Sequence, residues 1–475
     1  MIFNSYVFVL LFMPVFMIGY HLVRHFYLLG RLPKIICNLW IIAGSLIFYA
    51  LFGIGNLTII LISILWNICT SIPMSFMREH NKKVNAANVW LFAGVAGNLA
   101  LLLFFKMWNG MFPVAISFYT FNQIMYIVDL NRGDIEKFDT VDYLTYILFF
   151  PKILQGPLMN YGSFKSEMEK SFSSHLDWEK IMRGLLLFAM GLFKKVIMAD
   201  TFGKAVDFAY GNVAGLGSLE AFLTAIFYSF QLYFDFSGYC DMASALCVMM
   251  DMELPLNFDS PYKAVNIIDF WKRWHITLTA FFTKYVYIPL GGNRKGLARM
   301  YVNTMIIFLL SGFWHGKGIT FIVWGAMHGI LYVITRMFGG NRKGNIFTTF
   351  LTFMYVTAAW VFFRASSVKE AATLIARIFI GGKKTVATGI SSCFQLDELW
   401  YVIKVTPVMK FGFAWDICMW LFVAAAVFMI FFCQNAIRRT KDCRLGILST
   451  LLTAFLLIWS IVSFSGVSTF LYMNF

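Results

Sequence analysis

Charged residues are scarce in this chain. They make up 13% of its 475 residues, whereas 60% are hydrophobic and the mean hydropathy is +0.71. Soluble domains carry about 25% charged residues, so this composition excludes a water-soluble globular protein. Aromatic residues reach 19%, which suits helices that face lipid. We therefore expect an all-α polytopic membrane protein, a single domain over residues 1–475, with about eleven transmembrane helices plus a few broken or interfacial ones.

Common metal, disulfide and hydrolase motifs are absent as well. No Cys-x-x-Cys pair occurs, and most of the eight cysteines lie in apolar runs, where they behave as small buried hydrophobes. Zinc needs three or four suitably spaced ligands, and no cluster of cysteine and histidine provides them. The Gly-x-Ser-x-Gly elbow of serine hydrolases is missing too. We expect neither a metal ion nor a permanently bound cofactor.

Basic residues outnumber acidic ones by 39 to 24, which gives a formal charge of +15. They lie in short clusters between apolar spans, where they set topology and contact anionic lipid, so nucleic-acid binding is not expected. Basic loops at residues 24–34, 78–83 and 132 alternate with uncharged turns. The positive-inside rule places these loops in the cytoplasm and the N-terminus outside. The first span lacks a basic leader and a cleavage site, so we expect it to be retained.

The longest apolar run covers the 36 residues 300–335, with Lys317 as its single charge. A straight helix of that length would measure roughly 54 Å, far beyond the ~30 Å hydrocarbon core, so the run must break. The glycines at positions 312, 316 and 318 are expected to supply the break. His315 then lies at membrane depth, where non-helical backbone is tolerated only inside protein or beside a wet cavity. We therefore predict a solvent-connected polar pocket around His315.

Three of the seven histidines, His275, His315 and His328, lie around this broken run. A neutral imidazole is the general base best matched to neutral pH, so it can take the proton of a hydroxyl that attacks an ester or thioester. His315 is the expected base and His275 a second candidate, whereas His328 is expected to pack against Trp324. The alternative for each is a hydrogen bond inside a helix bundle, without chemistry.

Cations alternate with aromatic residues between positions 251 and 297, which indicates a helix along the membrane surface. The cations are Lys272, Arg273, Lys284, Arg294 and Lys295. They can hold the phosphates of a coenzyme A or phosphopantetheine donor, or bind anionic lipid headgroups. Asp269 is expected to cap the helix that carries the first of them. Asp235 and Asp241 stand near the end of an apolar run, where they either orient neighbouring side chains or mark a helix boundary.

An ordered series of motifs runs through the chain. In the second half these are Tyr233–Tyr239, Asn257–Phe258, Pro261–Tyr262, Asp269–Leu278, Tyr287–Arg294 and Trp314–Gly316. Outside that stretch they are Pro113–Phe121, Gly156–Pro157, Gly191–Lys195 and Trp360–Ala365. Together they resemble the membrane-bound O-acyltransferases, and within them most closely the alginate O-acetyltransferase branch.

The resemblance implies a ring of tilted helices around a thin central wall, with a funnel from each side meeting at His315. It makes His315 the principal catalytic histidine and His275 the second, within a catalytic core segment at residues 233–329. From the residues themselves we add Trp314, Trp274, Asp235 and Asp269 as supporting residues. Lys272, Arg273, Arg294 and Lys295 are the candidate donor-binding residues. Relatives often carry a different polar residue where this chain has Lys152, whose role stays open.

The activity implied is O-acetylation of an exported cell-surface polysaccharide of the alginate, cellulose or peptidoglycan type, from the bacterial cytoplasmic membrane. The donor is acetyl-CoA or an acyl-phosphopantetheine carrier on the cytoplasmic side. A separate extracytoplasmic esterase-like protein would finish the transfer, and a polysaccharide synthase complex is a further partner. Two alternatives remain. One is transfer of D-alanine from a carrier protein to teichoic acid, and the other is a transporter or channel without chemistry, whose paired half-repeats are not seen here.

Overall fold

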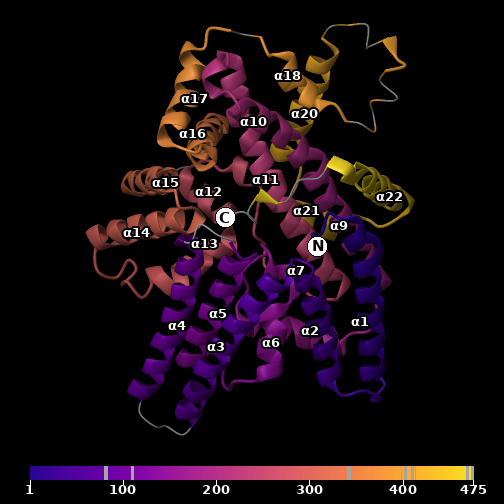
Figure 1. The fold of residues 1–475 in the computed structure, drawn as a ribbon, viewed down its shortest axis with the longest axis vertical. Coiled ribbons are helices and arrows are strands. Elements are labelled where there is room, and N and C mark those ends of the chain that lie inside the picture. The colour runs from indigo at the N-terminus through magenta and orange to yellow at the C-terminus, as the bar shows by residue number, and fades with distance from the viewer. Residues whose placement is uncertain are drawn as a thin grey trace.

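A computed structural model describes residues 1–79, 84–107, 112–339, 344–383, 385–396, 398, 400, 404–407, 411, 413–466 and 470–471. Within these ranges every element of secondary structure is helical, as the composition predicts (Figure 1). The α-helices are α1 (Met13–Leu28), α2 (Lys34–Ala50), α3 (Ile54–Glu79), α4 (Val84–Met107), α5 (Ile116–Arg132), α6 (Thr140–Leu148), α7 (Phe150–Ile153), α8 (Tyr161–Ser173), α9 (Trp178–Leu192), α10 (Asp200–Tyr210), α11 (Ser218–Met249), α12 (Ile267–Arg273), α13 (Ile276–Phe282), α14 (Leu297–His315), α15 (Ile319–Met337), α16 (Ile346–Arg364), α17 (Val368–Ile380), α18 (Thr388–Ser391), α20 (Ala414–Phe431), α21 (Ala436–Asp442) and α22 (Ile447–Val462). The π-helical turns are η1 (Val7–Phe12), η2 (Phe193–Ala199) and η5 (Thr283–Tyr287), and the 3-10 turns are η3 (Val213–Gly215), η4 (Pro261–Lys263), η6 (Ser392–Phe394) and η8 (Ser463–Gly466).

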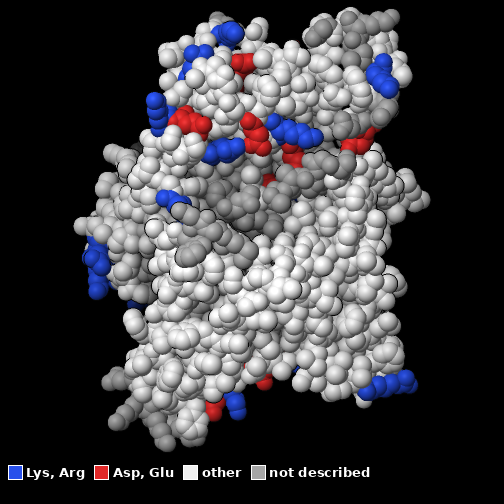
Figure 2. All heavy atoms as spheres, viewed as in Figure 1, with Lys and Arg blue, Asp and Glu red and all other residues white. Residues whose placement is uncertain are grey.

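Seven helices of the described chain are long and apolar enough to cross a membrane, and α2 and α22 are shorter apolar helices. The seven are η1 with α1, then α3, α4, α14, α15, α16 and α20. On the face shown in Figure 2, most of the central and lower surface is uncharged, and charged side chains gather across the upper third, at the left edge and at the lower edge. The chain is therefore a multi-pass membrane protein. The count of about eleven spans and the ring around a funnel stay predictions, and part of the basic loop at 78–83 lies outside the described residues.

Helix α11 is the central element of the fold. Its 32 residues are buried along almost their whole length, and it packs against α9, α10 and η2. Of the two alternatives given for Asp235 and Asp241, a helix boundary is wrong, because both residues lie inside α11. Gly191 of α9 and Gly238 of α11 allow the two helices to touch. A Cβ atom on Gly191 would lie 2.7 Å from the carbonyl oxygen of Gly238.

Buried ion pairs explain the two aspartates of α11. Lys194 Nζ lies 2.6 Å from Asp241 Oδ2, and Lys195 Nζ lies 2.8 Å from both Asp235 and Asp200. A carboxylate inside an apolar helix contact is tolerated only when a cation and hydrogen bonds compensate its lost hydration. The backbone N–H of Leu471 also donates to Asp235, at 3.0 Å. These aspartates thus join α11 to η2 and to the C-terminal segment.

The long apolar run breaks where its glycines predict. Helix α14 ends at His315, Gly316 is extended, and α15 begins at Ile319. Gly312 does not break the helix but lets α15 approach, because a Cβ atom there would lie 2.3 Å from the carbonyl oxygen of Phe321. The resulting hairpin runs across the view in Figure 1, whereas α3 and α4 run steeply through it. The predicted break is confirmed, and it leaves His315 at the inner end of a 19-residue helix.

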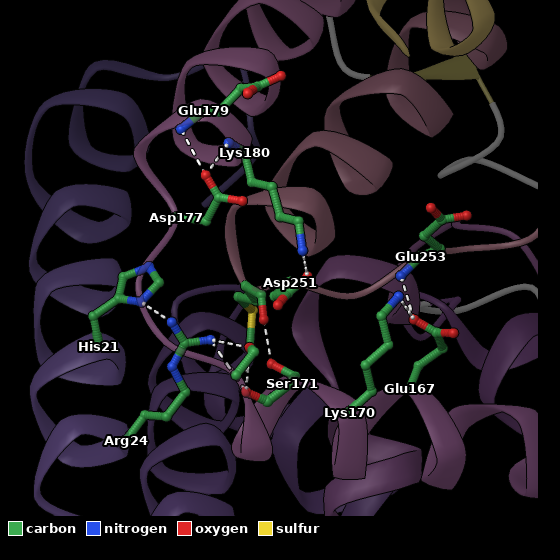
Figure 3. A network of polar contacts seen from close by, with 12 residues as sticks. His21, Arg24, Glu167, Lys170, Ser171, Asp177, Glu179, Lys180, Asp251 and Glu253 are labelled. Carbon is green, nitrogen blue, oxygen red and sulfur yellow. Dashed lines mark hydrogen bonds and ion pairs between the residues drawn. The ribbon is translucent and has the colours of Figure 1, made fainter. Parts of the chain in front are cut away.

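The segment at 141–162 is interrupted, as its prolines predict. It forms α6, the four-residue helix α7 and then an extended stretch before α8 begins. The polar residues that follow form a network between helices α1, α8 and α9 (Figure 3). Arg24 donates to the carbonyl oxygen of Ser171 at 3.1 Å, Lys180 pairs with Asp251, and the backbone N–H of Glu253 donates to Glu167 at 2.8 Å. These contacts connect the polar insert to the end of α11.

Candidate functional site

Two histidine rings lie close to the indole of Trp314. The ring centroid of Trp314 is 4.5 Å from that of His315 and 6.4 Å from that of His275. His315 is 3% exposed and His275 is 1% exposed, so both are buried. The rings of Trp324 and Phe363 also lie beside His315, at 5.2 and 5.1 Å. The structure therefore brings together the two histidines that the sequence placed in one site.

Trp314 is held from two sides. Its indole stacks on Phe121 of α5, with centroids 5.2 Å apart, and the ammonium of Lys106 donates a hydrogen bond to its backbone carbonyl oxygen. Lys106 ends α4 and is 3% exposed, and no carboxylate of the described residues lies within ion-pair distance of it. A cation at the last carbonyls of α14 meets the negative end of the helix dipole. The indole Nε1 of Trp314 is buried and has no hydrogen-bond partner among the described residues.

Lys106 was not found by sequence reasoning. It is a single lysine at the end of an apolar run, 208 positions before its partner Trp314, and no spacing rule connects the two. The one available signal is that a lysine within a membrane span is unusual and marks a functional candidate.

His275 connects α12 to α13 and has a left-handed backbone, with φ 46° and ψ 49°. A residue with a side chain reaches this region at a cost, so surrounding contacts must hold it there. The backbone N–H of Ile276 donates to the carbonyl oxygen of Asn257 at 3.0 Å, and that of Asp259 donates to the carbonyl oxygen of Arg273 at 2.9 Å. Residues 257–259 therefore hold the turn that carries His275.

The side chain of Asn257 contacts the imidazole directly. Its Oδ1 lies 3.2 Å from Nδ1 of His275 and also accepts from the backbone N–H and the hydroxyl of Thr277, at 3.3 and 2.9 Å. The other imidazole nitrogen, Nε2, is buried and has no hydrogen-bond partner among the described residues. Phe236 and Phe258 complete its surroundings, with ring centroids at 4.8 and 6.5 Å.

His328 lies apart from this pair. Its Nδ1 accepts a hydrogen bond from the indole of Trp271 at 3.3 Å, and its ring lies 5.0 Å from that of Trp324 and 6.1 Å from that of Phe270. The expected packing of His328 against Trp324 is confirmed.

A cavity of about 680 Å³ opens between α12, α13 and η5 on one side and α14 and α15 on the other. Its lining is mostly apolar and includes the cations Lys272, Lys284 and Arg336. Burial opposes the charge of Lys284, but hydrogen bonds to Asp129 and Asp134 outweigh that effect and raise its pKa. The cavity reaches Ser311, which lies one helical turn before His315 on the same face of α14. His315 itself is not part of this lining.

The proposed donor residues do not form one cluster. Lys272 lines the cavity, whereas Arg273 pairs with Asp269 at 2.9 Å and donates to the carbonyl oxygen of Asp259. Arg294 and Lys295 lie in an exposed turn before α14. The N-cap of α12 is Asn266, whose side chain accepts from the backbone N–H of Asp269. Asp269 is the third residue of the helix, and its side chain accepts from the backbone N–H of Val265 at 3.2 Å, so it supports the helix start without being the N-cap.

The remaining supporting residue, Trp274, is 1% exposed. Its ring lies 5.0 Å from those of Phe258 and Trp360, so it packs beside the turn that carries His275.

Lys152 is buried in α7, and its ammonium lies 3.0 Å from Asn122 Oδ1 and 3.8 Å from the ring centroid of Tyr146. No carboxylate of the described residues pairs with it.

His21 and His25 stand four residues apart on α1, a spacing that two ligands of one metal ion can have. His21 Nδ1 lies 3.1 Å from Arg24 Nη2. Within the described ranges, no group of three or more histidine, cysteine or carboxylate side chains could hold a metal ion.

Comparison with known proteins defines the family. The model of the membrane-bound O-acyltransferase family matches residues 46–368. The chain belongs to this family. It is 34% identical over 448 residues to the peptidoglycan O-acetyltransferase of Helicobacter pylori, which covers 84% of this chain and 82% of the relative. It is 35% identical over 410 residues to a probable alginate O-acetylase of Pseudomonas putida, covering 80% and 81%. A teichoic acid D-alanyltransferase of Bacillus subtilis is 26% identical over 352 residues, covering 67% and 88%. The chain is thus a membrane-bound acyltransferase.

Proposed function

We propose that this protein moves an acetyl group from a cytoplasmic donor across the membrane for O-acetylation of an exported cell-surface polysaccharide. The proposal rests on the pair of buried imidazoles, His275 and His315, that border Trp314. It also rests on relatives that acetylate a polysaccharide and match four-fifths of the chain. The D-alanine-transferring relative is less similar, so acetyl transfer is the preferred activity.

His315 acts as the general base in this proposal. It takes the proton of an attacking hydroxyl, whose oxygen then bonds to the carbonyl carbon of an acetyl thioester. The carbon–sulfur bond breaks and the departing thiolate receives the proton, so the imidazole returns to its neutral form. Burial suits this role because an apolar environment keeps the imidazole uncharged before it accepts the proton. His275 is the second histidine, which contacts the reacting groups beside Trp314.

The donor is acetyl-CoA or an acyl-phosphopantetheine carrier, and the cavity between α12, α13, α14 and α15 is its candidate entrance. Lys272 and Arg336 line this cavity, and phosphate groups favour such cations. The apolar remainder of the lining suits the arm that carries the thioester. Ser311 brings the inner end of the cavity within one turn of His315. Arg273, Arg294 and Lys295 are weaker donor candidates because none of them is part of this lining.

The acceptor is a polysaccharide of the alginate, cellulose or peptidoglycan type. Relatives named for peptidoglycan and for alginate are similar to this chain to nearly the same degree, so identity does not choose between them. A separate extracytoplasmic esterase-like protein would complete the transfer, beside a polysaccharide synthase. The chain would lie in the bacterial cytoplasmic membrane with its N-terminus outside.

Replacing the proposed base tests this function. His315→Ala is expected to abolish O-acetylation in cells that lack the native gene, measured as acetate released from the purified polysaccharide by mild base. His175→Ala is the matched control, because His175 is an exposed histidine between α8 and α9. Full acetylation with His315→Ala, at equal protein in the membrane, would refute the assignment. Vesicles supplied with radiolabelled acetyl-CoA or with a D-alanyl carrier protein would separate the two transfer reactions.

A further inference from the structure

We infer that Asn257 is a positioning residue that holds His275 in one tautomer, with the lone pair of Nε2 directed at the reaction site. This inference rests on the proposed acetyl transfer but concerns a residue outside the two histidines. It follows from a chain of hydrogen bonds that joins three separate segments of the sequence.

The orientation of the Asn257 amide is fixed by a donor that cannot change its role. The backbone N–H of Thr277 points at one atom of the amide, at 3.3 Å, so that atom must be the carbonyl oxygen Oδ1. The Nδ2 atom on the other side lies 3.4 Å from Cys240 Sγ, which can accept a weak hydrogen bond. The amide therefore offers His275 an acceptor, not a donor.

The tautomer of His275 follows from this orientation. Nδ1 lies 3.2 Å from the amide oxygen, so Nδ1 must carry the proton and donate it to Asn257. A neutral imidazole with Nδ1 protonated has its lone pair on Nε2. Nε2 is the atom that has no hydrogen-bond partner among the described residues, although it is buried. An acceptor left open in an apolar centre is free to take a proton or a hydrogen bond from a substrate.

Thr277 keeps the amide oxygen in place. Its hydroxyl donates to Asn257 Oδ1 at 2.9 Å and accepts from the backbone N–H of Leu158 at 3.0 Å. Leu158 follows the Gly156–Pro157 turn, so the interrupted segment after α7 is part of the same chain of bonds. His275 has a left-handed backbone, and its ring contacts Asn257, which lies 18 positions earlier in the sequence. Together these contacts leave the imidazole a single orientation.

The tautomer itself can be measured. The full-length protein, labelled with nitrogen-15 in histidine and embedded in lipid bilayers, gives separate solid-state NMR signals for protonated and unprotonated ring nitrogens. The His275 signal is assigned by its loss in His275→Gln. In the unmodified protein we expect a protonated Nδ1 and an unprotonated Nε2. Protonation of Nε2 in that sample would overturn the inference, whatever the protein's activity.

Two substitutions then separate positioning from folding. Asn257→Ala removes the acceptor, so the His275 signal should split between both tautomers and acetyl transfer from radiolabelled acetyl-CoA should fall about 10- to 100-fold. Asn257→Asp keeps an acceptor at the same place, so it should keep the tautomer and most of the transfer rate. Asn98→Ala is the control for loss of a buried asparagine, because Asn98 bonds to Asn67 in a different part of the bundle. An Asn257→Ala protein that keeps both the single tautomer and the rate would refute the positioning role. If the unmodified protein transferred no acetyl group in this assay, that result would count against the proposed function, and the NMR measurement would still decide the tautomer.

Discussion

The ion pair between Lys194 and Asp241 yields a prediction about folding. The ammonium of Lys194 lies 2.6 Å from the carboxylate of Asp241, and the two side chains are 8% and 3% exposed. Lys194→Met would therefore leave the Asp241 carboxylate buried without a cation. Loss of one partner of a buried pair costs about 3–5 kcal/mol, because the remaining charge is uncompensated. Replacing both partners, as Lys194→Met with Asp241→Leu, should recover most of that loss, since an apolar pair of similar volume suits this helix contact.

The assay is the fraction of protein that stays monodisperse in detergent after heating. The control is Arg364→Met, which removes an ion pair of similar length, 2.7 Å, whose Asp207 side chain is 68% exposed. Exposed pairs contribute about 0–1 kcal/mol, so this variant should melt almost like the unmodified protein. Equal melting of the Lys194 and Arg364 single variants, or no recovery in the double variant, would refute the argument from burial.

Two further predictions concern the site. Lys106→Met should lower acetyl transfer, because it removes the hydrogen bond that helps to hold Trp314. It should leave the protein at least as resistant to heating, because it removes a buried cation that no carboxylate of the described residues compensates. A clear loss of thermal stability would contradict this. Lys272→Gln should raise the KM for acetyl-CoA about 10-fold with kcat unchanged, as expected for one lost contact to phosphate. The control is Lys369→Gln, which changes an exposed lysine of α17. An equal KM for acetyl-CoA in both variants would exclude the cavity as the donor entrance.

Local sequence signals predicted the parts of the fold that depend on nearby residues. The glycines after position 312 end α14 at His315, and the prolines at 151 and 157 interrupt the segment between α6 and α8. Both outcomes follow from backbone preferences that act over a few residues. The ordered motifs also placed His275 and His315 in one site before any contact was known.

Contacts between distant residues were beyond this reasoning. Asp235 and Asp241 look like helix-ending residues until Lys195 and Lys194 are found against them, 40 and 47 positions earlier. Asn266 is the N-cap of α12 and Asp269 is the third residue of that helix, because the backbone path sets where the helix begins. The Thr277–Asn257 contact requires the first turn of α13 to meet the segment between α11 and α12. Such contacts depend on tertiary packing, which propensity and spacing do not encode.

Two buried polar atoms at the proposed site lack a hydrogen-bond partner among the described residues, and this supports a chemical role for the site. Nε2 of His275 and Nε1 of Trp314 are buried without partners among the described residues, and Lys106 brings a cation to the carbonyl oxygen of Trp314. A buried polar atom left without a hydrogen bond costs about 1–3 kcal/mol, and a buried charge costs more. Packing alone would favour apolar residues at these three positions. A reacting hydroxyl and an acetyl carbonyl would supply the missing donor and acceptor, so we expect Nε2 of His275 and Nε1 of Trp314 to gain partners when substrate binds.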